Sequence, residues 1–479
     1  MAMIVLLLLN ATYIQVVSAD TYRTDPRNRR VLLDEYSRQR GKIVAGGLPV
    51  ASSVETGGQL RFQRSYLDGP MYAPVTGYYS LRYGAGGIEN AMDSVLNGSD
   101  GRLFVRRLSD LITGRTPSGG SVELTINPIV QRVAYEQLTR RGYNGAVVAI
   151  KPSTGEILAM ASTPSYDPNR LSAHDGTEQE AAWNEATSAQ RGAPLTNRAV
   201  GSTYPPGSTF KLVVTAAALE TGKATPDSPL TATPALQLQD TSTFLRNFAN
   251  NPCGRGDTAT LTEALVRSCN TAFAQLVATV GENDLRKQAQ LLGIGQQDLT
   301  IPILVTPSTL GDIPDVSALQ QSGIGQRDVA LTPLQNATIA ATIANGGRRM
   351  TPQLVRSILA PDLSVLDRLE PELAETAMSR FTASRLRDMM VAAENTYSND
   401  GKINGVSIAA KTGTAEHGAN PKNTPPHGWY VAFAPAEDPQ VAIAVVVEDG
   451  GDRALEATGG SRAAPIGRAV IRAALQGGR

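Results

Sequence analysis

Apolar residues gather in runs along the chain, and the spacing of these runs changes near residue 140. Before that point the runs are short and alternate with polar residues, as in QLRFQRSY, and turn-rich stretches such as YYSLRYGAGG separate them. Alternation with a period of two residues is typical of strands that are buried on one face. We therefore expect residues 20–140 to form an extended, partly β N-terminal domain with no chemistry of its own.

Longer elements follow from Gly145 onward. The stretch GAVVAIKPSTGEILAMAS holds two apolar runs around a turn sequence, which predicts a β-hairpin. Helices are expected after Ser208, at about residues 258–280, and in TPLQNATIAATIANGG, where Thr332 would cap the helix and Gly346 would end it. The stretches VSIAAKTGT and HGWYVAFAPAEDPQVAIAVVVEDGG predict three more strands before a closing helix near residues 462–476.

This order of elements defines the fold class that we expect. A hairpin, a helical block, three strands and a last helix fit an α+β domain over residues 141–479, built on a five-stranded antiparallel sheet. With 479 residues, of which 41% are hydrophobic, the chain is long enough for two or more domains.

The first 19 residues, MAMIVLLLLNATYIQVVSA, carry no charge and hold the densest apolar run of the chain. Their length is barely enough to cross a bilayer. We interpret residues 1–19 as a membrane anchor or its remnant, with a buried core helix as the alternative. No Lys or Arg precedes the run to orient it, which is unusual for an anchor. In a chain anchored in the cell membrane, everything after Asp20 would lie outside the cytoplasm.

Net charge and cysteine content limit the partners and the compartment. Lys and Arg together number 44, as do Asp and Glu, so the charge gives no reason to expect a nucleic acid partner. The two cysteines, Cys253 and Cys269, can form a disulfide in an oxidising compartment, and two buried thiols are the alternative. The expected extracytoplasmic location favours the disulfide.

The first motif that could carry chemistry is Ser208-Thr209-Phe210-Lys211, at the start of a predicted helix. A hydroxyl and an amine three residues apart on a helix project from one face, so a neutral Lys211 could take the proton of Ser208. The N–H groups at the helix start would help to hold a negative charge. The pattern S-x-x-K is common by chance, but of the eight lysines only Lys211 has a serine three positions before it.

A second motif, Lys411-Thr412-Gly413-Thr414, ends a predicted strand whose edge suits an extended peptide. Gly413 would allow the substrate backbone to come close. The amine of Lys411 and the hydroxyls of Thr412 and Thr414 would bind a terminal carboxylate. Alone, the motif is equally compatible with a surface turn.

A third motif is Ser268-Cys269-Asn270. Ser268 could relay a proton between the lysines and a departing amine, and Asn270 could bond a peptide carbonyl through its amide. Alone, S-x-N is close to background and compatible with an ordinary turn or cap. The three motifs in the order S-x-x-K, S-x-N and K-T-G are the signature of penicillin-binding proteins and serine β-lactamases.

Longer segments around these motifs carry a resemblance. YPPGSTFK, SCNTAF, KTGTAEHG and TPPHGWYVAFAP, together with DPRNRRVLLDEYSRQRG near the N-terminus, resemble class B penicillin-binding proteins of actinobacteria. The resemblance runs from about residue 4 to the C-terminal end. It implies a penicillin-recognising serine-enzyme fold behind a non-catalytic pedestal, and a D,D-transpeptidase that cross-links peptidoglycan and that β-lactams inhibit.

The resemblance also implies residue roles and partners. Ser208 would be the nucleophile, Lys211 the base, and the backbone N–H groups of Ser208 and Thr414 the oxyanion hole. The other catalytic residues would be Ser268, Asn270 and Lys411. The implied partners are peptidoglycan stem peptides, β-lactam antibiotics and a membrane glycan polymerase, and no metal or cofactor is required.

A serine β-lactamase and a β-lactam sensor share the three motifs and are the alternatives. The large region before residue 140 argues against a β-lactamase, which usually needs none, and we find no acidic residue to assign as a deacylating base. A sensor would usually carry extra membrane spans or a cytoplasmic effector, and we see neither in the sequence. A scaffold protein would not need an intact Ser208, Lys211 and Lys411, so we rank it last.

The three histidines, His174, His417 and His427, do not form a metal-binding pattern. The last two lie in the Gly- and Pro-containing loop that we expect after K-T-G-T. We interpret them as solvated loop residues, with a role in shaping the cleft as the alternative.

Overall fold

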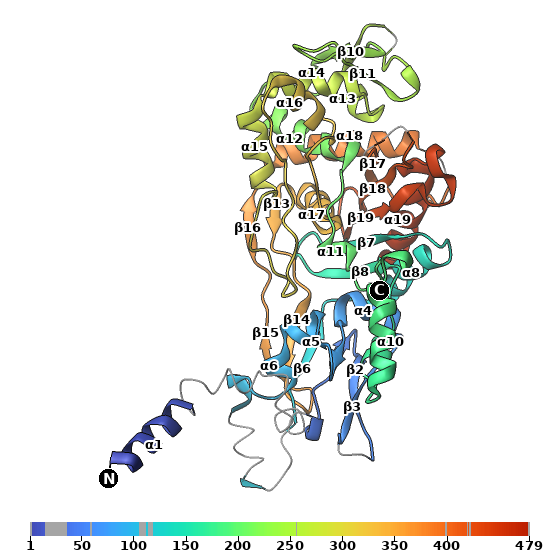
Figure 1. Ribbon diagram of the computed structural model, residues 1–479. Helices are drawn as coiled ribbons and strands as arrows, with labels where there is room; N and C mark the ends of the chain where they lie inside the picture. The colour runs from blue at the N-terminus through green and yellow to red at the C-terminus, as the bar shows by residue number, and fades with distance from the viewer. Residues whose placement is uncertain are drawn as a thin grey trace.

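The computed structural model describes residues 2–14, 36–57, 60–104, 112–113, 118–254, 256–397, 400–418, 420 and 423–477. Two sheets organise this part of the chain (Figure 1). A six-stranded sheet lies among the N-terminal residues, and a five-stranded sheet lies at the centre of the larger C-terminal region.

The central sheet is antiparallel throughout. Its five strands follow the order β17 (Ala409–Ala415), β18 (His427–Ala434), β19 (Val441–Val447), β7 (Gly145–Ile150) and β8 (Ile157–Thr163). The early hairpin pairs with the last three strands, so the predicted five-stranded antiparallel sheet is confirmed. Strand β17, which carries the K-T-G-T motif, lies at one edge.

Helices cover both faces of the central sheet. On one face, α8 (Pro128–Thr139) and α19 (Gly459–Gln476) share an apolar cluster with Tyr430. On the other face, α17 (Pro333–Ala344) and α12 (Lys211–Glu220) share a second cluster with Trp429. Because successive side chains of a strand point to opposite faces, β18 contributes to both cores. Strands that are covered on both faces need continuous apolar runs, which is what HGWYVAFA and VAIAVVV provide.

A helical block separates the two parts of the central sheet. The helical structure expected at about residues 258–280 is present as two helices that break at Ser268, whose φ is +59°. The helices of the block are α9 (Pro168–Leu171), α10 (Gly176–Thr187), α11 (Arg198–Gly201), α12, α13 (Leu261–Val266), α14 (Asn270–Val280), α15 (Glu282–Leu291), α16 (Val316–Ser322), α17 and α18 (Arg380–Thr396). Short strand pairs accompany them: β9 (Pro229–Thr231) with β12 (Thr258–Thr260), β10 (Ala235–Gln237) with β11 (Phe244–Arg246), and β13 (Arg348–Met350) with β16 (Leu373–Thr376).

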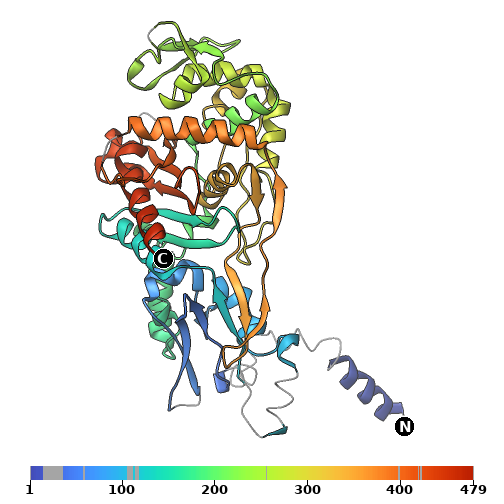
Figure 2. The ribbon, with the colours of Figure 1, turned by 180° about the vertical axis from the view of Figure 1, so that it is seen from behind.

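The N-terminal sheet contains strands from two distant parts of the sequence. Its order is β15 (Val365–Arg368), β14 (Val355–Leu359), β6 (Ser121–Leu124), β1 (Ile43–Ala45), β2 (Leu48–Glu55) and β3 (Phe62–Tyr66). Figure 2 shows the orange segment with β14 and β15 reaching from the helical block to this sheet. The chain therefore crosses between its two sheets more than once, and a boundary at residue 140 stays a prediction.

The N-terminal region also contains short elements and buried ion pairs. Its short elements are α4 (Gly69–Thr76), β4 (Tyr79–Ser80), β5 (Gly84–Ala85), α5 (Gly87–Ala91), α6 (Asp93–Leu96) and η2 (Gly101–Leu103). Buried Glu89 accepts from Arg40 at 2.7 Å and from Arg64 at 2.6 Å. Burial alone would raise the pKa of Glu89, but the two guanidinium groups hold it below its usual value.

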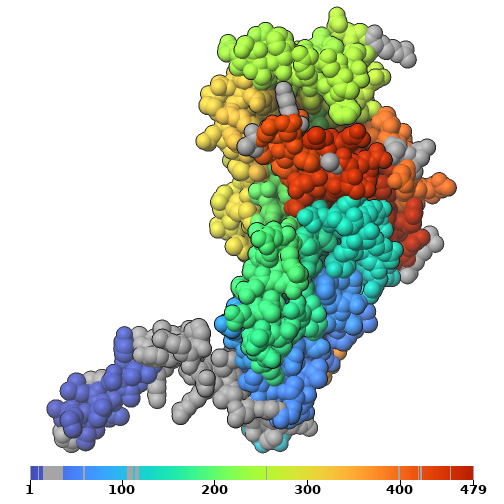
Figure 3. Space-filling view, turned by 45° about the vertical axis from the view of Figure 1, so that its right-hand side comes forward, coloured from blue at the N-terminus to red at the C-terminus, as the bar shows by residue number. Residues whose placement is uncertain are grey.

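Helix α10 joins the two regions, because it packs against the N-terminal segment (Figure 3). At this contact the hydroxyl of Ser80 donates to Gln179 Oε1 at 2.6 Å.

The N-terminal apolar run begins as helix α1 (Ala2–Thr12), and residues 15–19 of the predicted anchor lie outside the described residues. Within the described ranges, we find no helix with the length and apolarity that a membrane span requires.

Candidate active site

Ser208 lies in a 3-10 turn, η4 (Gly207–Phe210), which leads directly into α12. Gly207 has a φ of +53°, a left-handed conformation that glycine adopts without strain. A Cβ atom at this position would also lie 2.7 Å from the carbonyl oxygen of Thr414. Glycine therefore allows the turn to rest against β17, and it leaves the half-buried Ser208 side chain beside that strand.

Lys211 is fully buried, and its amine contacts the second motif. Lys211 Nζ donates to Ser268 O at 2.7 Å and to Asn270 Oδ1 at 2.8 Å, and it lies 3.3 Å from Ser268 Oγ. Burial, and then the nearby Lys411, hold the pKa of the Lys211 amine well below its usual range. A neutral amine that uses its two N–H groups on these two oxygens keeps a lone pair that can accept a proton.

The hydroxyl of Ser268 lies between two amines. Lys411 Nζ donates to Ser268 Oγ at 2.9 Å and to Thr412 O at 3.0 Å, and Lys211 Nζ lies 3.3 Å from the same Oγ. Lys411 is fully buried, and burial lowers its pKa to about 7. The structure thus joins the three predicted motifs in one hydrogen-bonded group, although Ser268 is 57 residues from Lys211 and 143 residues from Lys411.

Asn270 is held in place from three directions at the start of α14. Its Oδ1 accepts from Lys211, its Nδ2 donates to Arg246 O at 3.0 Å, and its backbone N–H donates to Asn247 Oδ1 at 2.8 Å. The buried Asn247 side chain also accepts from the backbone N–H of Thr271 at 3.1 Å. Asn247 therefore acts as the cap of α14 from outside the helix, and it fixes the residue that holds Lys211.

Cys269 is the middle residue of the second motif and is joined to Cys253 by a disulfide. Both cysteines are buried. The bridge ties the turn between α13 and α14 to the loop before β12.

Strand β17 presents its free edge beside the turn that holds Ser208. The N–H of Thr412 donates to the hydroxyl of Tyr397 at 3.3 Å, so it points away from β18. Backbone N–H groups alternate between the two sides of a strand, so the N–H of Thr414 points to the same edge. A Cβ atom at Gly413 would lie 2.8 Å from Pro206 O, which shows how closely the strand meets the turn.

The chain matches known proteins along most of its length. Residues 145–472 match the penicillin binding protein transpeptidase domain, and residues 40–122 match the penicillin binding protein A dimerisation domain. The chain belongs to the penicillin-binding proteins. The resemblance to the class B members, and among them to penicillin-binding protein A, is confirmed.

Two curated relatives of this penicillin-binding protein are similar along their full length. The peptidoglycan D,D-transpeptidase PbpA of Mycolicibacterium smegmatis is 55% identical over 100% of this chain and 97% of its own length. The protein of the same name from Mycobacterium tuberculosis is 54% identical with the same coverage. A solved structure of penicillin-binding protein A from M. tuberculosis, a ceftriaxone acyl-enzyme complex, has a TM-score of 0.91 at 52% identity and covers 93% of this chain and 100% of that one.

The sequence analysis missed two residues that hold the site residues of this penicillin-binding protein in place. Asn247 is one, and it lies in the asparagine-rich stretch NFANN with nothing to mark it. Trp429 is the other: it is fully buried, and its indole N–H donates to Pro205 O at 2.9 Å, three residues before Ser208. A tryptophan in an apolar strand indicates a core position, so its hydrogen bond to the segment before Ser208 has no sequence signal.

His427 contradicts the prediction of solvated loop histidines. It is the first residue of β18 and is buried, because the strand begins before the loop was expected to end. Its ring stacks on His417 with the centroids 3.7 Å apart, and burial, followed by the charge of His417, lowers the pKa of His427 to about 3. His427 Nδ1 accepts from the N–H of Asp449, and His417 Nε2 contacts both Pro425 O at 2.9 Å and Asp449 Oδ1 at 3.1 Å. His427 Nδ1 and His417 Nε2 are thus already paired, although one ligand atom each of His417, His427 and Asp449 lies within 4.8 Å of the other two, a spacing that could hold a metal ion.

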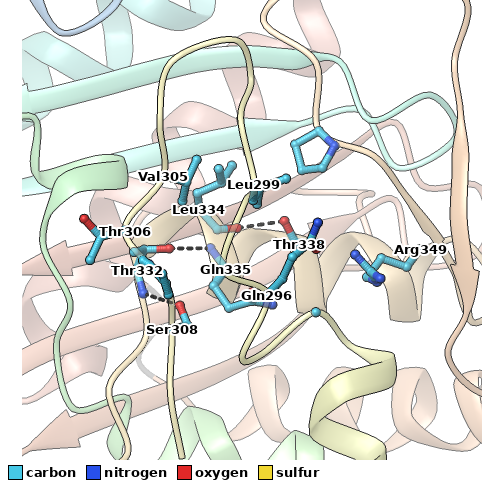
Figure 4. A pocket seen from close by; sticks show the side chains of 13 residues that line it. Gln296, Leu299, Val305, Thr306, Ser308, Thr332, Leu334, Gln335, Thr338 and Arg349 are labelled. Carbon is cyan, nitrogen blue, oxygen red and sulfur yellow. Dashed lines mark hydrogen bonds between the residues drawn. The ribbon is translucent and has the colours of Figure 1, made fainter.

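A small cavity beside the first turns of α17 is lined by none of the motif residues (Figure 4). Thr332 caps the helix there, as predicted, and accepts from the N–H of Gln335 at 3.1 Å. Ser308 Oγ accepts from the N–H of Thr332 at 3.0 Å. The hydroxyl groups of Thr332 and Ser308 are therefore used at the start of α17.

Proposed function

We propose that this penicillin-binding protein is a peptidoglycan D,D-transpeptidase that works through an acyl-enzyme on Ser208. The observation that carries the proposal is the hydroxyl of Ser268, within hydrogen-bond reach of both Lys211 and Lys411. The curated relatives of 54% and 55% identity, which carry the name peptidoglycan D,D-transpeptidase, support it.

In the first half-reaction, the Ser208 oxygen attacks the carbonyl carbon between the last two D-alanines of a stem peptide. The lone pair of Lys211 accepts the Ser208 proton. The carbonyl oxygen gains a negative charge, which the N–H groups of Ser208 and Thr414 stabilise. The carbon–nitrogen bond then breaks as Ser268 passes its proton to the leaving nitrogen and takes back the proton held by Lys211, so D-alanine departs and the acyl ester remains.

In the second half-reaction, an amine of a neighbouring stem peptide attacks the ester. The amine loses a proton through the same relay, and the Ser208 oxygen leaves with a proton, so the cross-link forms and the enzyme is restored. During both steps the stem peptide lies along the free edge of β17. Lys411, Thr412 and Thr414 bind its carboxylate, and Gly413 leaves room for its backbone.

A β-lactam acylates Ser208 by the same first step. Its carbon–nitrogen bond lies in a ring, so the leaving nitrogen stays tethered and hinders attack on the ester. Solved structures of penicillin-binding protein A from M. tuberculosis, 52% identical to this chain, are acyl-enzyme complexes of ceftriaxone, imipenem and penicillin G. These complexes support acylation by β-lactams in this chain as well.

The proposal places residues 1–19 in the cell membrane as a single-pass anchor, with residues 20–140 and 141–479 outside the cytoplasm. Helix α1 supports this location, because it consists of apolar and small polar residues and exposes Met3, Leu6 and Leu7. The disulfide between Cys253 and Cys269 fits an oxidising compartment. A membrane glycan polymerase would supply the glycan strands to be cross-linked. The resemblance of this chain to class B penicillin-binding proteins supports this partner.

The test is to incubate the full chain with a fluorescent penicillin and to map the label by mass spectrometry. We expect a stable adduct on Ser208 and no adduct on the Ser208→Ala variant. The matched control is Ser202→Ala, which changes a serine upstream of the same turn and should label like the wild type. Label on another residue would refute the proposal, and loss of the adduct within minutes would support the β-lactamase alternative.

A further inference from the structure

Gln326 forms a two-point contact with the end of strand β17. Its side-chain amide, in the orientation that satisfies both atoms, donates from Nε2 to Glu416 O at 3.1 Å and accepts at Oε1 from the N–H of Glu416 at 3.3 Å. Both backbone groups of one residue point to the same side of a strand, so Gln326 pairs with Glu416 as a neighbouring strand would. The chain thus gains one strand-like pair beyond Ala415, the last residue of β17.

This contact lies on the edge of β17 that faces the substrate. Thr412, Thr414 and Glu416 share that edge because N–H groups alternate along a strand. The N–H of Thr412 is bonded to the hydroxyl of Tyr397, and the N–H of Glu416 is bonded to Gln326. Thr414, the proposed oxyanion-hole residue, lies between these two bonded positions. Tyr397 and Gln326 therefore fix the edge on both sides of the Thr414 N–H.

The residue before Gln326 contacts the other half of the oxyanion hole. Gly325 O accepts from the N–H of Gly207 at 2.9 Å, directly before Ser208. Gly325 has a φ of +71°, and a Cβ atom there would lie 2.1 Å from Gly207 O. The dipeptide 325–326 is thus bonded on one side to the nucleophile turn and on the other side to the end of β17.

Gln326 is also well anchored on its own side. Its backbone N–H donates to Gln321 O at 3.3 Å, and the N–H of Gly325 donates to Ser322 O at 2.9 Å, so both residues close the end of α16. Because these hydrogen bonds fix the backbone of Gln326, its side chain extends from a well-defined position. The position of Glu416, and with it that of Thr414, is then set relative to Ser208 through few rotatable bonds.

We propose that Gln326 is a positioning residue that sets the distance between the two N–H groups of the oxyanion hole, those of Ser208 and Thr414. The inference rests on the proposed acyl transfer at Ser208. Gln326 itself does not touch the reacting atoms in this assignment. It acts through Glu416, and its loss would let the end of β17 move relative to the nucleophile turn.

The consequence should appear in the acylation step and not in binding. Removal of an oxyanion-hole donor typically costs 10²- to 10³-fold in rate, and a misplacement of about 1 Å can cost 10²-fold. Because Q326A leaves both donors present but less well placed, we expect the acylation rate constant k2 to fall by about 10- to 100-fold. The binding constant Ks for the β-lactam should stay within about twofold, since Lys411, Thr412 and Thr414 still bind its carboxylate.

The experiment measures k2 and Ks of the full chain with a fluorescent penicillin by stopped flow, for the wild type, Q326A, Q326E and the control Q321A. Q326E keeps the size of the side chain and the acceptor for the Glu416 N–H, but it sets a carboxylate oxygen against Glu416 O, so k2 should fall without a cavity. Gln321 contacts Ser317 through its side chain and should have no effect when shortened. Thermal melting checks that each variant is folded at the assay temperature. If Q326A is unfolded at that temperature, the inference is tested with Q326E instead.

A second readout separates positioning from general destabilisation. The carbonyl stretching band of the acyl-enzyme, formed with a ¹³C-labelled penicillin, reports the hydrogen bonds that the ester oxygen accepts in the oxyanion hole. We expect this band to move to higher frequency in Q326A and Q326E and to stay unchanged in Q321A. Wild-type k2 and an unshifted band in both Gln326 variants would overturn the inference, and so would an equal fall of k2 in Q321A. A wild type that is not acylated at Ser208 would instead refute the proposed function.

Discussion

Replacement of Asn247 by alanine should disturb the active site without touching any of the three motifs. Asn247 Oδ1 accepts from the backbone N–H groups of Asn270 and Thr271, and Nδ2 donates to Thr233 O at 2.9 Å. Asn247→Ala removes two groups at once. The first turn of α14 loses the side-chain oxygen that accepts from its N–H groups, and Thr233 O loses the side-chain N–H that donates to it. The residue is buried, so water does not readily replace these bonds.

The size of the effect follows from these contacts. Loss of a cap typically destabilises a helix by about 1 kcal/mol, and a buried donor left without an acceptor costs about 1–3 kcal/mol. We therefore expect Asn247→Ala to lower the free energy of unfolding by about 2–4 kcal/mol. Acylation should also slow, because Asn270 then holds Lys211 less firmly.

Asn247→Asp separates the two halves of the contact. A carboxylate keeps the acceptor for the α14 N–H groups, and its negative charge is favourable at a helix N-terminus. It cannot donate to Thr233 O. We expect the aspartate variant to recover part of the stability and most of the acylation rate, which would assign the catalytic effect to the acceptor side.

Urea denaturation followed by far-UV circular dichroism gives the free energy of unfolding, and labelling with a fluorescent penicillin gives the acylation rate. Asn251→Ala is the matched control, since its side chain is exposed on the same loop. An Asn247→Ala variant within about 0.5 kcal/mol of the wild type would contradict the estimate of bond energies. Loss of stability with unchanged acylation would contradict the link between Asn247 and Lys211.

Three other predictions concern the groups around the site. The pKa of Lys411 is about 7, so its charge is lost as pH rises through 7, and Ks for a carboxylate-bearing β-lactam should weaken over that range. In a Lys411→Arg variant, which stays charged, stopped-flow measurements of Ks at increasing pH should show no such weakening around pH 7. Trp429→Phe removes the donor to Pro205 O and should lower the free energy of unfolding by about 1–3 kcal/mol in urea, whereas an unchanged value would count against that bond. Cys253→Ser with Cys269→Ser opens a bridge of sequence separation 16, which should cost about 3 kcal/mol, and reductant should lower the melting temperature of the wild type alone.

The central sheet could be predicted from the sequence because each of its strands is locally marked. The apolar runs of β7, β8, β18 and β19 are bounded by turn residues, and their order along the chain fits one antiparallel sheet. The three motifs could be found for a related reason. Their residue types carry the chemistry, so a serine, a lysine and a glycine at set spacings are informative before any contact is known.

Non-local pairing was not predictable in the same way. Strand β14 pairs with β6 across more than 200 residues and carries β15 on its other side, and nothing in the stretch around residues 355–368 indicates that partner. The break at Ser268 was also missed, because a helix-forming pattern continues through it, whereas the positive φ of Ser268 and the extended Cys269 separate α13 from α14. Asn247 and Gln326 act through backbone groups of other segments, and such contacts leave no pattern in the sequence.

The pair of buried lysines provides a physical reason why the proposed base, Lys211, can be neutral in this site. Neither Lys211 nor Lys411 has a described carboxylate among the groups that shift its pKa, so no negative charge offsets two buried ammonium groups. Burial favours the neutral amine, and the charge of one lysine disfavours a charge on the other. The fold therefore favours the state in which only one of the two lysines is a charged ammonium group over the state in which both are charged. Burial and the nearby Lys411 lower the pKa of Lys211, and this residue lies one helix turn from Ser208, so a neutral Lys211 amine offers its lone pair next to that hydroxyl.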